Sequence, residues 1–187
     1  MRVLFFFNAF VNVSGGDVRF IEIVKRLTKK SINVEIITSS IGRKVCLEHD
    51  INTRFYLTTR EKSIDDLNVI WLYLKRTSKA LKLNLHIKDA DVLYSTSDFV
   101  PDVFPAFILK LKNRNLKWIQ IIHHLYEDPF KRKGKNFLTN LLGFLSQRLS
   151  FVLIKKKADL IIVVNQVVKR QLLKMGFDER KIIVSNN

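Results

Sequence analysis

The sequence is poor in cysteine, glycine and proline. Its 187 residues include one cysteine, six glycines and three prolines. The single cysteine, Cys46, excludes a disulfide framework and a zinc site built from cysteines, and it fits a protein of the reducing cytosol. The low content of glycine and proline excludes collagen-like, flexible-linker and proline-rich segments.

Long hydrophobic runs are also missing. The apolar run at the amino terminus, residues 3–7, ends at Asn8 and is shorter than the roughly 7–15 residues of a signal-peptide core. The most apolar longer segment, 137–154, is interrupted by polar residues, whereas a membrane span needs about 18 uninterrupted apolar residues. We therefore expect a cytoplasmic protein without a spanning helix.

Acidic residues are few compared with basic ones. The chain has 33 Lys and Arg against 17 Asp and Glu, a net charge of +16, and it is 47% hydrophobic. That hydrophobic content excludes a disordered chain. The charge favours an anionic partner, such as an acidic membrane surface, a phosphorylated substrate or nucleic acid, although lysines that merely face solvent give the same composition. Nucleic acid is the least favoured, because the basic residues are scattered and no binding motif is present.

Short apolar runs alternate with helical patterns along the whole chain, which predicts an α/β fold. Near-continuous apolar strands are typical of a parallel sheet covered on both faces. We predict an open, doubly wound parallel sheet in one domain, 1–187, because a closed eight-fold barrel needs about 250 residues. The predicted strands are 3–7, 34–37, 54–57, 91–95, 118–122, 160–164 and 181–184.

Several helix starts can be read from capping residues. Ser63 begins a capping-box pattern for a long helix that reaches about Leu85. Asp98 is predicted to cap the next helix, with Pro101 in its first turn. Asn165 is predicted to cap a short helix that Gly176 ends.

Ligands of open α/β sheets bind beyond the carboxyl ends of the strands, and a glycine pair lies at the first such place. Gly15 and Gly16 precede the first predicted helix. Paired glycines let the backbone approach a ligand closely, and a helix N-terminus attracts anions. The Gly-x-Gly-x-x-Gly and Gly-Lys-Ser/Thr signatures are both absent. A plain tight turn capped by Asp17 is the structural alternative.

Two histidines lie at another strand end. His123 and His124 follow the predicted strand 118–122. An imidazole titrates near neutral pH, so either could transfer a proton or orient a substrate hydroxyl. Neighbours on a strand point to opposite faces, so we do not expect the pair to share one metal ion. Structural or surface histidines are the alternative.

The predicted helix over 137–153 has an unusually wide apolar face. At 100° per residue its apolar side chains cover an arc of roughly 200°, and Phe137, Phe144 and Phe151 repeat along one edge. An apolar band flanked by lysines can lie on an anionic membrane surface. The alternative is that one edge packs on the sheet and the other on a neighbouring helix.

Taken together, these segments resemble the N-terminal, acceptor-binding domain of the GT-B-fold glycosyltransferases of family 4, over essentially the whole chain. The resemblance rests on the order and spacing of three motifs: Gly15-Gly16 after the first strand, His123 at a strand end, and a C-terminal motif. The C-terminal motif runs from Ala158-Asp159 through the strand 160–164 and Gly176-Phe177 to Asn186-Asn187. His124 stands where the family usually has Asp, and Asn187 where Gly is usual.

The resemblance implies a Rossmann-like half of a retaining glycosyltransferase whose C-terminal, donor-binding domain is absent from this chain. His123 would be catalytic, and Gly15, Gly16, Asp17, His124 and Asn186 would bind substrate. The expected partners are a donor-binding domain or chain and a sugar or lipid-linked acceptor, at the inner face of a membrane. The donor substrate would be a nucleotide sugar, and no cofactor or metal is expected. The alternatives are a non-catalytic basic module that binds an anionic membrane or nucleic acid, and an inactive fragment.

Overall fold

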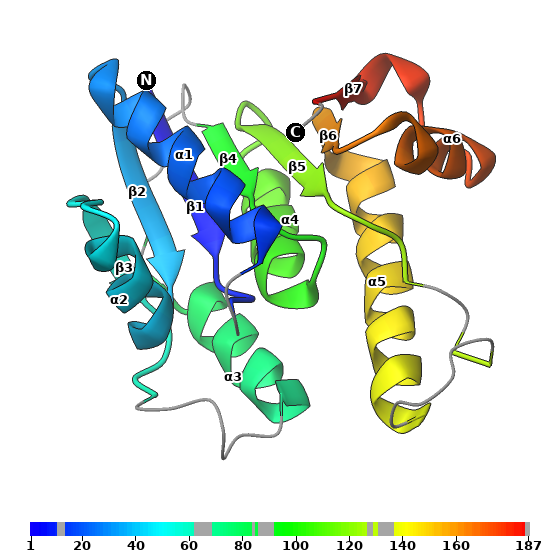
Figure 1. Cartoon of the computed structure of the whole chain (residues 1–187), viewed down its shortest axis with the longest axis horizontal. Helices are drawn as coiled ribbons and strands as arrows, with labels where there is room; N and C mark the ends of the chain where they lie inside the picture. Colours follow the sequence, from blue (N-terminus) through cyan, green and yellow to red (C-terminus); the bar gives the residue numbers. More distant parts are fainter. Residues whose placement is uncertain are drawn as a thin grey trace.

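The computed structural model is an open sheet of seven parallel strands with helices on both faces (Figure 1). It describes residues 1–10, 14–61, 69–83, 85, 92–126, 129–130 and 137–185, without the side chains of 138 and 139. The strands are β1 (Arg2–Phe7), β2 (Asn33–Thr38), β3 (Arg54–Leu57), β4 (Val92–Ser95), β5 (Lys117–Ile122), β6 (Leu160–Val163) and β7 (Ile182–Val184). The helices are α1 (Gly15–Lys29), α2 (Ser40–Glu48), α3 (Val69–Leu81), α4 (Val100–Lys112), α5 (Phe137–Lys157), α6 (Gln166–Lys174) and the 3-10 turn Glu179–Lys181.

The strand order is β3-β2-β1-β4-β5-β6-β7, so β1 lies inside the sheet and the chain changes direction beside it. The strands β2 and β3 lie on one side of β1, and β4 and the later strands lie on the other side. Such a reversal opens a crevice at the carboxyl ends of the two strands on either side of it. The topology therefore places a ligand site between the ends of β1 and β4.

Two hydrophobic cores, one on each face, hold the sheet. Alternate residues of β1 contribute to each: Phe5 and Phe7 pack with α1 and α2, and Leu4 and Phe6 pack with the remaining helices. All four side chains are at most 2% exposed. A strand buried on both faces has no polar side to show, which is why it appears in the sequence as one apolar run.

The predicted fold class is confirmed: seven parallel strands are present, each close to its predicted position. The short helix α2 was not predicted, although Ile41, Val45 and Cys46 recur at helical spacing and pack in the core. The predicted start at Ser63 lies outside the described residues. The described helix α3 ends at Leu81, short of the predicted Leu85.

The prediction that Asp98 caps α4 is wrong. The N-cap residue is Phe99, and Pro101 does lie in the first turn. Asp98 is instead buried and accepts a hydrogen bond from the Gln147 side-chain amide. Because that partner comes from α5, 49 residues further along the chain, local sequence could not indicate it.

The helix α5 uses its wide apolar arc in two ways. On one edge, Phe151 and Ile154 are buried in the core. On the other edge, Leu145, Leu149 and Val152 are each at least 50% exposed. The helix also packs against the neighbouring helix α4, so both parts of the packing alternative are observed, while the edge that carries Leu149 stays exposed among the described residues.

Candidate functional site

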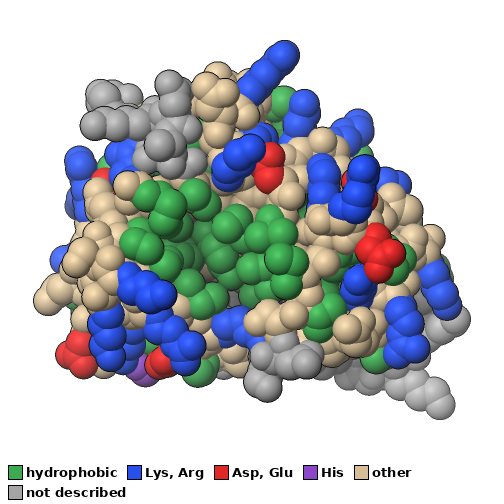
Figure 2. Space-filling view, turned by 90° about the horizontal axis from the view of Figure 1, so that it is seen from above, with side chains coloured by type: hydrophobic (Ala, Val, Ile, Leu, Met, Phe, Trp, Pro, Cys, Tyr) green, Lys and Arg blue, Asp and Glu red, His purple; other side chains and the backbone are tan. Residues whose placement is uncertain are grey.

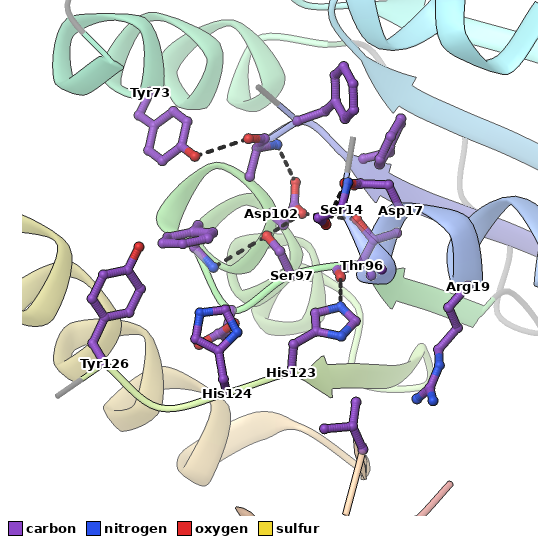
Figure 3. Close-up of a pocket in the computed structure, with 18 residues that line it drawn as sticks. Ser14, Asp17, Arg19, Tyr73, Thr96, Ser97, Asp102, His123, His124 and Tyr126 are labelled. Atoms are coloured by element: carbon purple, nitrogen blue, oxygen red, sulfur yellow. Dashed lines mark hydrogen bonds between the residues drawn. The ribbon is translucent and has the colours of Figure 1, made fainter. Parts of the chain in front are cut away.

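A pocket of about 480 Å³ lies at the carboxyl ends of β1, β4 and β5 (Figure 3). It is lined by the loop after β1, the first turn of α1, the loop after β4 and the residues after β5. Five of the predicted site residues line this pocket: Gly15, Gly16, Asp17, His123 and His124. The sixth, Asn186, lies outside the described residues.

The glycine pair forms the first turn of α1 rather than a loop before it. Ser14 is the N-cap residue, and Asp17 occupies the third helical position. The Asp17 carboxylate accepts from the Ser14 backbone N–H at 2.8 Å and from the Ser14 hydroxyl at 2.6 Å. The alternative with Asp17 as the cap is wrong, because Asp17 acts from inside the helix on the residue before it. Partial burial raises the pKa of the Asp17 carboxyl.

Gly16 allows His123 to approach the backbone of α1. A Cβ atom at position 16 would lie 2.6 Å from the Nε2 atom of His123 and 2.8 Å from its Cε1 atom. A Cβ atom at Gly15 would meet no atom within 4 Å. The two glycines therefore differ: only Gly16 is required by the packing of the imidazole.

His123 is held in one tautomer. Its Nε2 atom lies 3.0 Å from the Thr96 carbonyl oxygen, and since a carbonyl only accepts, Nε2 carries the proton. In the neutral ring Nδ1 is then a hydrogen-bond acceptor. Burial lowers the pKa of His123 from its usual value, despite opposing effects of the Thr96 hydrogen bond and Asp98. The ring is therefore neutral at pH 7.

His124 also lines the pocket, because β5 ends at Ile122 and the alternation of a strand no longer applies beyond it. Its ring lies 5.8 Å from that of Tyr126. The expectation that the two imidazoles take opposite faces is therefore wrong. Among the described residues, no group of three or more His, Cys, Asp or Glu side chains is placed to hold a metal ion.

The loop after β1 is held by side chains that were not singled out from the sequence. The Asp102 carboxylate accepts from the backbone N–H groups of Asn8 at 2.7 Å and of Ala9 at 3.0 Å. The Arg76 guanidinium donates to the carbonyls of Asn8, at 3.0 Å, and Phe10. The Tyr73 hydroxyl donates to the Ala9 carbonyl at 3.0 Å (Figure 3). These contacts satisfy the polar backbone of a buried loop, as burial requires.

Asp102 is a buried carboxyl with four hydrogen-bond donors. Besides the two backbone groups, the hydroxyls of Thr96 and Ser97 donate to its Oδ2 atom. Burial raises the pKa of Asp102 to about 7, although these hydrogen bonds oppose the shift. The cluster joins the loops after β1 and β4 at one carboxyl group.

Gln147 joins the loops after β4 and β5 in a similar way. Its amide nitrogen donates to the Asp98 carboxylate and to the His124 carbonyl, and its oxygen accepts from the Tyr126 backbone N–H at 2.8 Å. Its side chain is buried. A glutamine within a predicted amphipathic helix gives no sign of this role in the sequence, because solvent-facing glutamines look the same.

The fold and the pocket define a doubly wound α/β domain with a cavity at its topological switch point. A family model described as Glycosyltransferase Family 4 matches residues 13–187. The chain therefore belongs to glycosyltransferase family 4, and the resemblance to the N-terminal domain of such an enzyme is confirmed.

Solved structures share this fold at low sequence identity. The Anabaena protein HepE, in complex with UDP and glucose, matches with a TM-score of 0.61 and 16% identity over 100% of this chain and 44% of its own. A UDP-N-acetylglucosamine 2-epimerase from Rickettsia bellii matches with a TM-score of 0.62 and 12% identity over 100% of this chain and 45% of its own. The chain thus spans less than half the length of these proteins. No curated protein matches the sequence significantly.

Proposed function

We propose that this chain is the acceptor-side domain of a retaining glycosyltransferase, which transfers a sugar from a nucleotide sugar to an acceptor hydroxyl. A donor-binding domain, in the same protein or in a partner chain, holds the nucleotide. The observation that carries the proposal is the seating of the neutral His123 ring against Gly16, in the pocket between β1 and β4. Membership of glycosyltransferase family 4 supports the reaction class.

His123 is proposed to orient the reacting sugar. With Nε2 committed to the Thr96 carbonyl, the Nδ1 atom accepts a hydrogen bond from a sugar hydroxyl. The first turn of α1 offers backbone N–H groups at Gly15 and Gly16, and a helix N-terminus favours the negative charge of a leaving diphosphate. Asp17 and His124 contribute further polar groups to the lining of the pocket.

Catalysis then depends on positioning and on electrostatic support, and we propose that it needs neither metal nor cofactor. The acceptor oxygen forms a bond to the anomeric carbon as the bond from that carbon to the nucleoside diphosphate breaks, and the hydroxyl proton passes to the leaving diphosphate. Fixed donors and a fixed imidazole stabilise the charge that develops, without the cost of reorganising water.

We further propose that the protein works in the cytoplasm, at the inner face of a membrane, on a lipid-linked acceptor. The net charge of +16 favours attraction to anionic lipid, and Figure 2, which views the molecule from the amino ends of the strands, shows Lys and Arg side chains that are scattered rather than gathered into a nucleic-acid-binding stripe. No helix among the described residues is long and apolar enough to cross a membrane, so the proposed association is peripheral.

The test is transfer by the chain together with its donor-binding polypeptide. The tagged chain is used to co-purify that polypeptide, and transfer is measured with radiolabelled UDP-glucose, UDP-N-acetylglucosamine and GDP-mannose. His123→Ala is expected to lower kcat by about a hundredfold, the loss that misplacement of a reacting group can cause, with an unchanged circular dichroism spectrum.

His49→Ala is the matched control, because His49 is exposed and follows α2, outside the pocket. Its transfer rate should equal that of the wild type. Wild-type turnover by His123→Ala would overturn the assigned role. Recovery of only lipid or nucleic acid, with no donor-binding polypeptide and no transfer, would favour a basic binding module instead.

A further inference from the structure

A second cavity, an apolar groove of about 430 Å³, runs between α3 and α5. Its α3 wall is made by Val69, Ile70 and Leu74, and its α5 wall includes Leu145 and Leu149. These five side chains are between 38% and 55% exposed. Among the described residues no charged side chain lines the groove. So large an apolar surface open to water is typical of a binding site.

The groove is continuous with the polar pocket. Tyr73, Phe99 and Tyr126 line both cavities. The Phe99 ring lies 5.8 Å from that of Tyr73 and 5.9 Å from that of Tyr126, so the three rings form an aromatic strip between the two cavities. Tyr73 and Tyr126 stand at the end of the pocket opposite Arg19 (Figure 3).

The strip is firmly held. The Tyr73 hydroxyl donates to the Ala9 carbonyl at 3.0 Å. A Cβ atom at Gly143 of α5 would lie 3.1 Å from the Tyr126 ring, so the ring packs directly on the helix backbone. Because the two cavities share this strip, a ligand that fills the pocket and extends past the three rings reaches the groove.

We propose that the groove holds the hydrocarbon chain of a lipid-linked acceptor whose polar head lies in the pocket beside His123. The proposal rests on the proposed function and adds the place where the hydrocarbon chain of the acceptor binds. A hydrocarbon chain needs no hydrogen-bond partner, which fits a wall of Leu, Ile, Val and aromatic side chains. A free sugar would leave this wall exposed to water, and a protein interface usually carries a polar rim.

The first test is leucine-methyl NMR of the full chain with two probes. Dodecyl β-D-glucoside, kept below its micelle concentration, is compared with methyl β-D-glucoside. The dodecyl probe should shift the methyl signals of Leu74, Leu145 and Leu149 in a saturable way, and the methyl probe should leave these signals unchanged. Leu145→Asp should weaken binding of the dodecyl probe at least tenfold.

Leu111→Asp is the matched control, since Leu111 is 44% exposed on α4 and does not line the groove. It should bind the dodecyl probe like the wild type. Equal shifts at Leu47, Leu111 and the groove would indicate general surfactant binding and overturn the proposal. So would groove signals that shift with protein concentration alone, which indicates a second copy, or only with phosphatidylglycerol vesicles, which indicates a membrane surface. If Leu145→Asp does not fold, Leu74→Asp on the opposite wall gives the same comparison.

A second measurement separates this proposal from the proposed function. In the transfer assay, Leu145→Asp should raise KM for a lipid-linked acceptor without changing kcat. An unchanged KM with normal transfer would overturn the proposal that the groove binds the acceptor chain, and it would leave the proposed glycosyltransferase activity standing. Saturable binding in the groove without transfer to any acceptor would overturn the proposed glycosyltransferase activity and leave the groove as a lipid-binding site.

Discussion

The two ends of the combined cavity are built in opposite ways. Around His123, the pocket depends on buried polar side chains that tie three loops together, namely Arg76, Asp102 and Gln147. Between α3 and α5, the groove is lined by half-exposed apolar side chains such as Leu149. The shape of the pocket is fixed by hydrogen bonds that hold its loops in one conformation. The groove depends on apolar surface, which can accept substitutions more easily.

The difference suggests that the pocket sets the orientation of a ligand, whereas the groove adds to the affinity for it. A sugar must be oriented to within fractions of an ångström for transfer, and only a fully satisfied polar network gives that precision. A hydrocarbon chain needs only apolar surface. Substitutions at the pocket end should therefore cost folding free energy, whereas substitutions at the groove end should cost almost none.

The largest effect is expected for Arg76→Met. The change leaves the carbonyls of Asn8 and Phe10 and the Glu61 carboxylate without their buried partner. Breaking a buried ion pair by removing one member costs about 3–5 kcal/mol, and urea unfolding measures it. Lys75→Met, at the exposed neighbouring position on α3, should change stability by no more than about 0.5 kcal/mol. Equal effects of the two variants would contradict the role of Arg76.

Asp102→Asn should remove a pH dependence. With a pKa of about 7 in the folded state and about 3.9 when unfolded, the carboxyl binds more protons in the native protein between pH 4 and 7. Stability contributed by this group is therefore present below pH 4 and is lost as pH rises to 7, with a slope of at most about 1.4 kcal/mol per pH unit.

The asparagine cannot titrate, and its oxygen can still accept from Asn8 and Ala9. Urea unfolding of both proteins at pH 4.5, 5.5, 6.5 and 7.5 measures the difference, in which contributions of other groups cancel. The variant should gain stability relative to the wild type as pH rises. A difference that stays constant across this range would refute the raised pKa.

Gly16→Ala is expected to cost about 1–3 kcal/mol, the usual cost of overpacking, because the new methyl group overlaps the His123 ring. Imidazole nitrogen NMR should show that the Nε2 hydrogen bond to Thr96 is lost. Gly15→Ala is the matched control: its methyl group meets open space, and alanine favours a helix by up to about 1 kcal/mol. A Gly16→Ala protein as stable as Gly15→Ala would show that the close contact is not needed.

The smallest effect is expected in the groove. Leu149→Ala should change the free energy of unfolding by less than about 1 kcal/mol, since Leu149 is 53% exposed. Ile154→Ala, on the same helix but fully buried, should cost about 2–5 kcal/mol. Thermal unfolding of the pair measures the contrast, and similar losses would mean that the groove is part of the structural core.

Local patterns were enough to predict the sheet but not all of the helices. Buried parallel strands such as β1 are continuous apolar runs, and their edges stand out against the polar residues between them. The helix α2 was missed because it is short: its nine residues carry a single helical repeat, formed by Ile41, Val45 and Cys46. The cap of α4 was assigned wrongly because Asp98 is a good capping residue whose actual partner, Gln147, is distant in sequence.

The candidate site divides in the same way. Gly15, Gly16, Asp17, His123 and His124 could be selected from the sequence because they follow apolar strands, and the carboxyl ends of parallel strands meet at one edge. Arg76, Asp102 and Gln147 could not be selected in this way, because the sequence does not show whether a polar residue is buried or exposed to solvent.

The sequence by itself determined the alternation of strands and helices, the parallel sheet and the edge at which a ligand would bind, since these depend on periodicity and on the chemistry of single residues. Only the tertiary structure decided that Gly16 packs against His123, that Asp102 and Arg76 hold the loop after β1, and that α3 and α5 leave a groove between them. Each of these features joins side chains far apart in the sequence, and packing in three dimensions is what selects their partners.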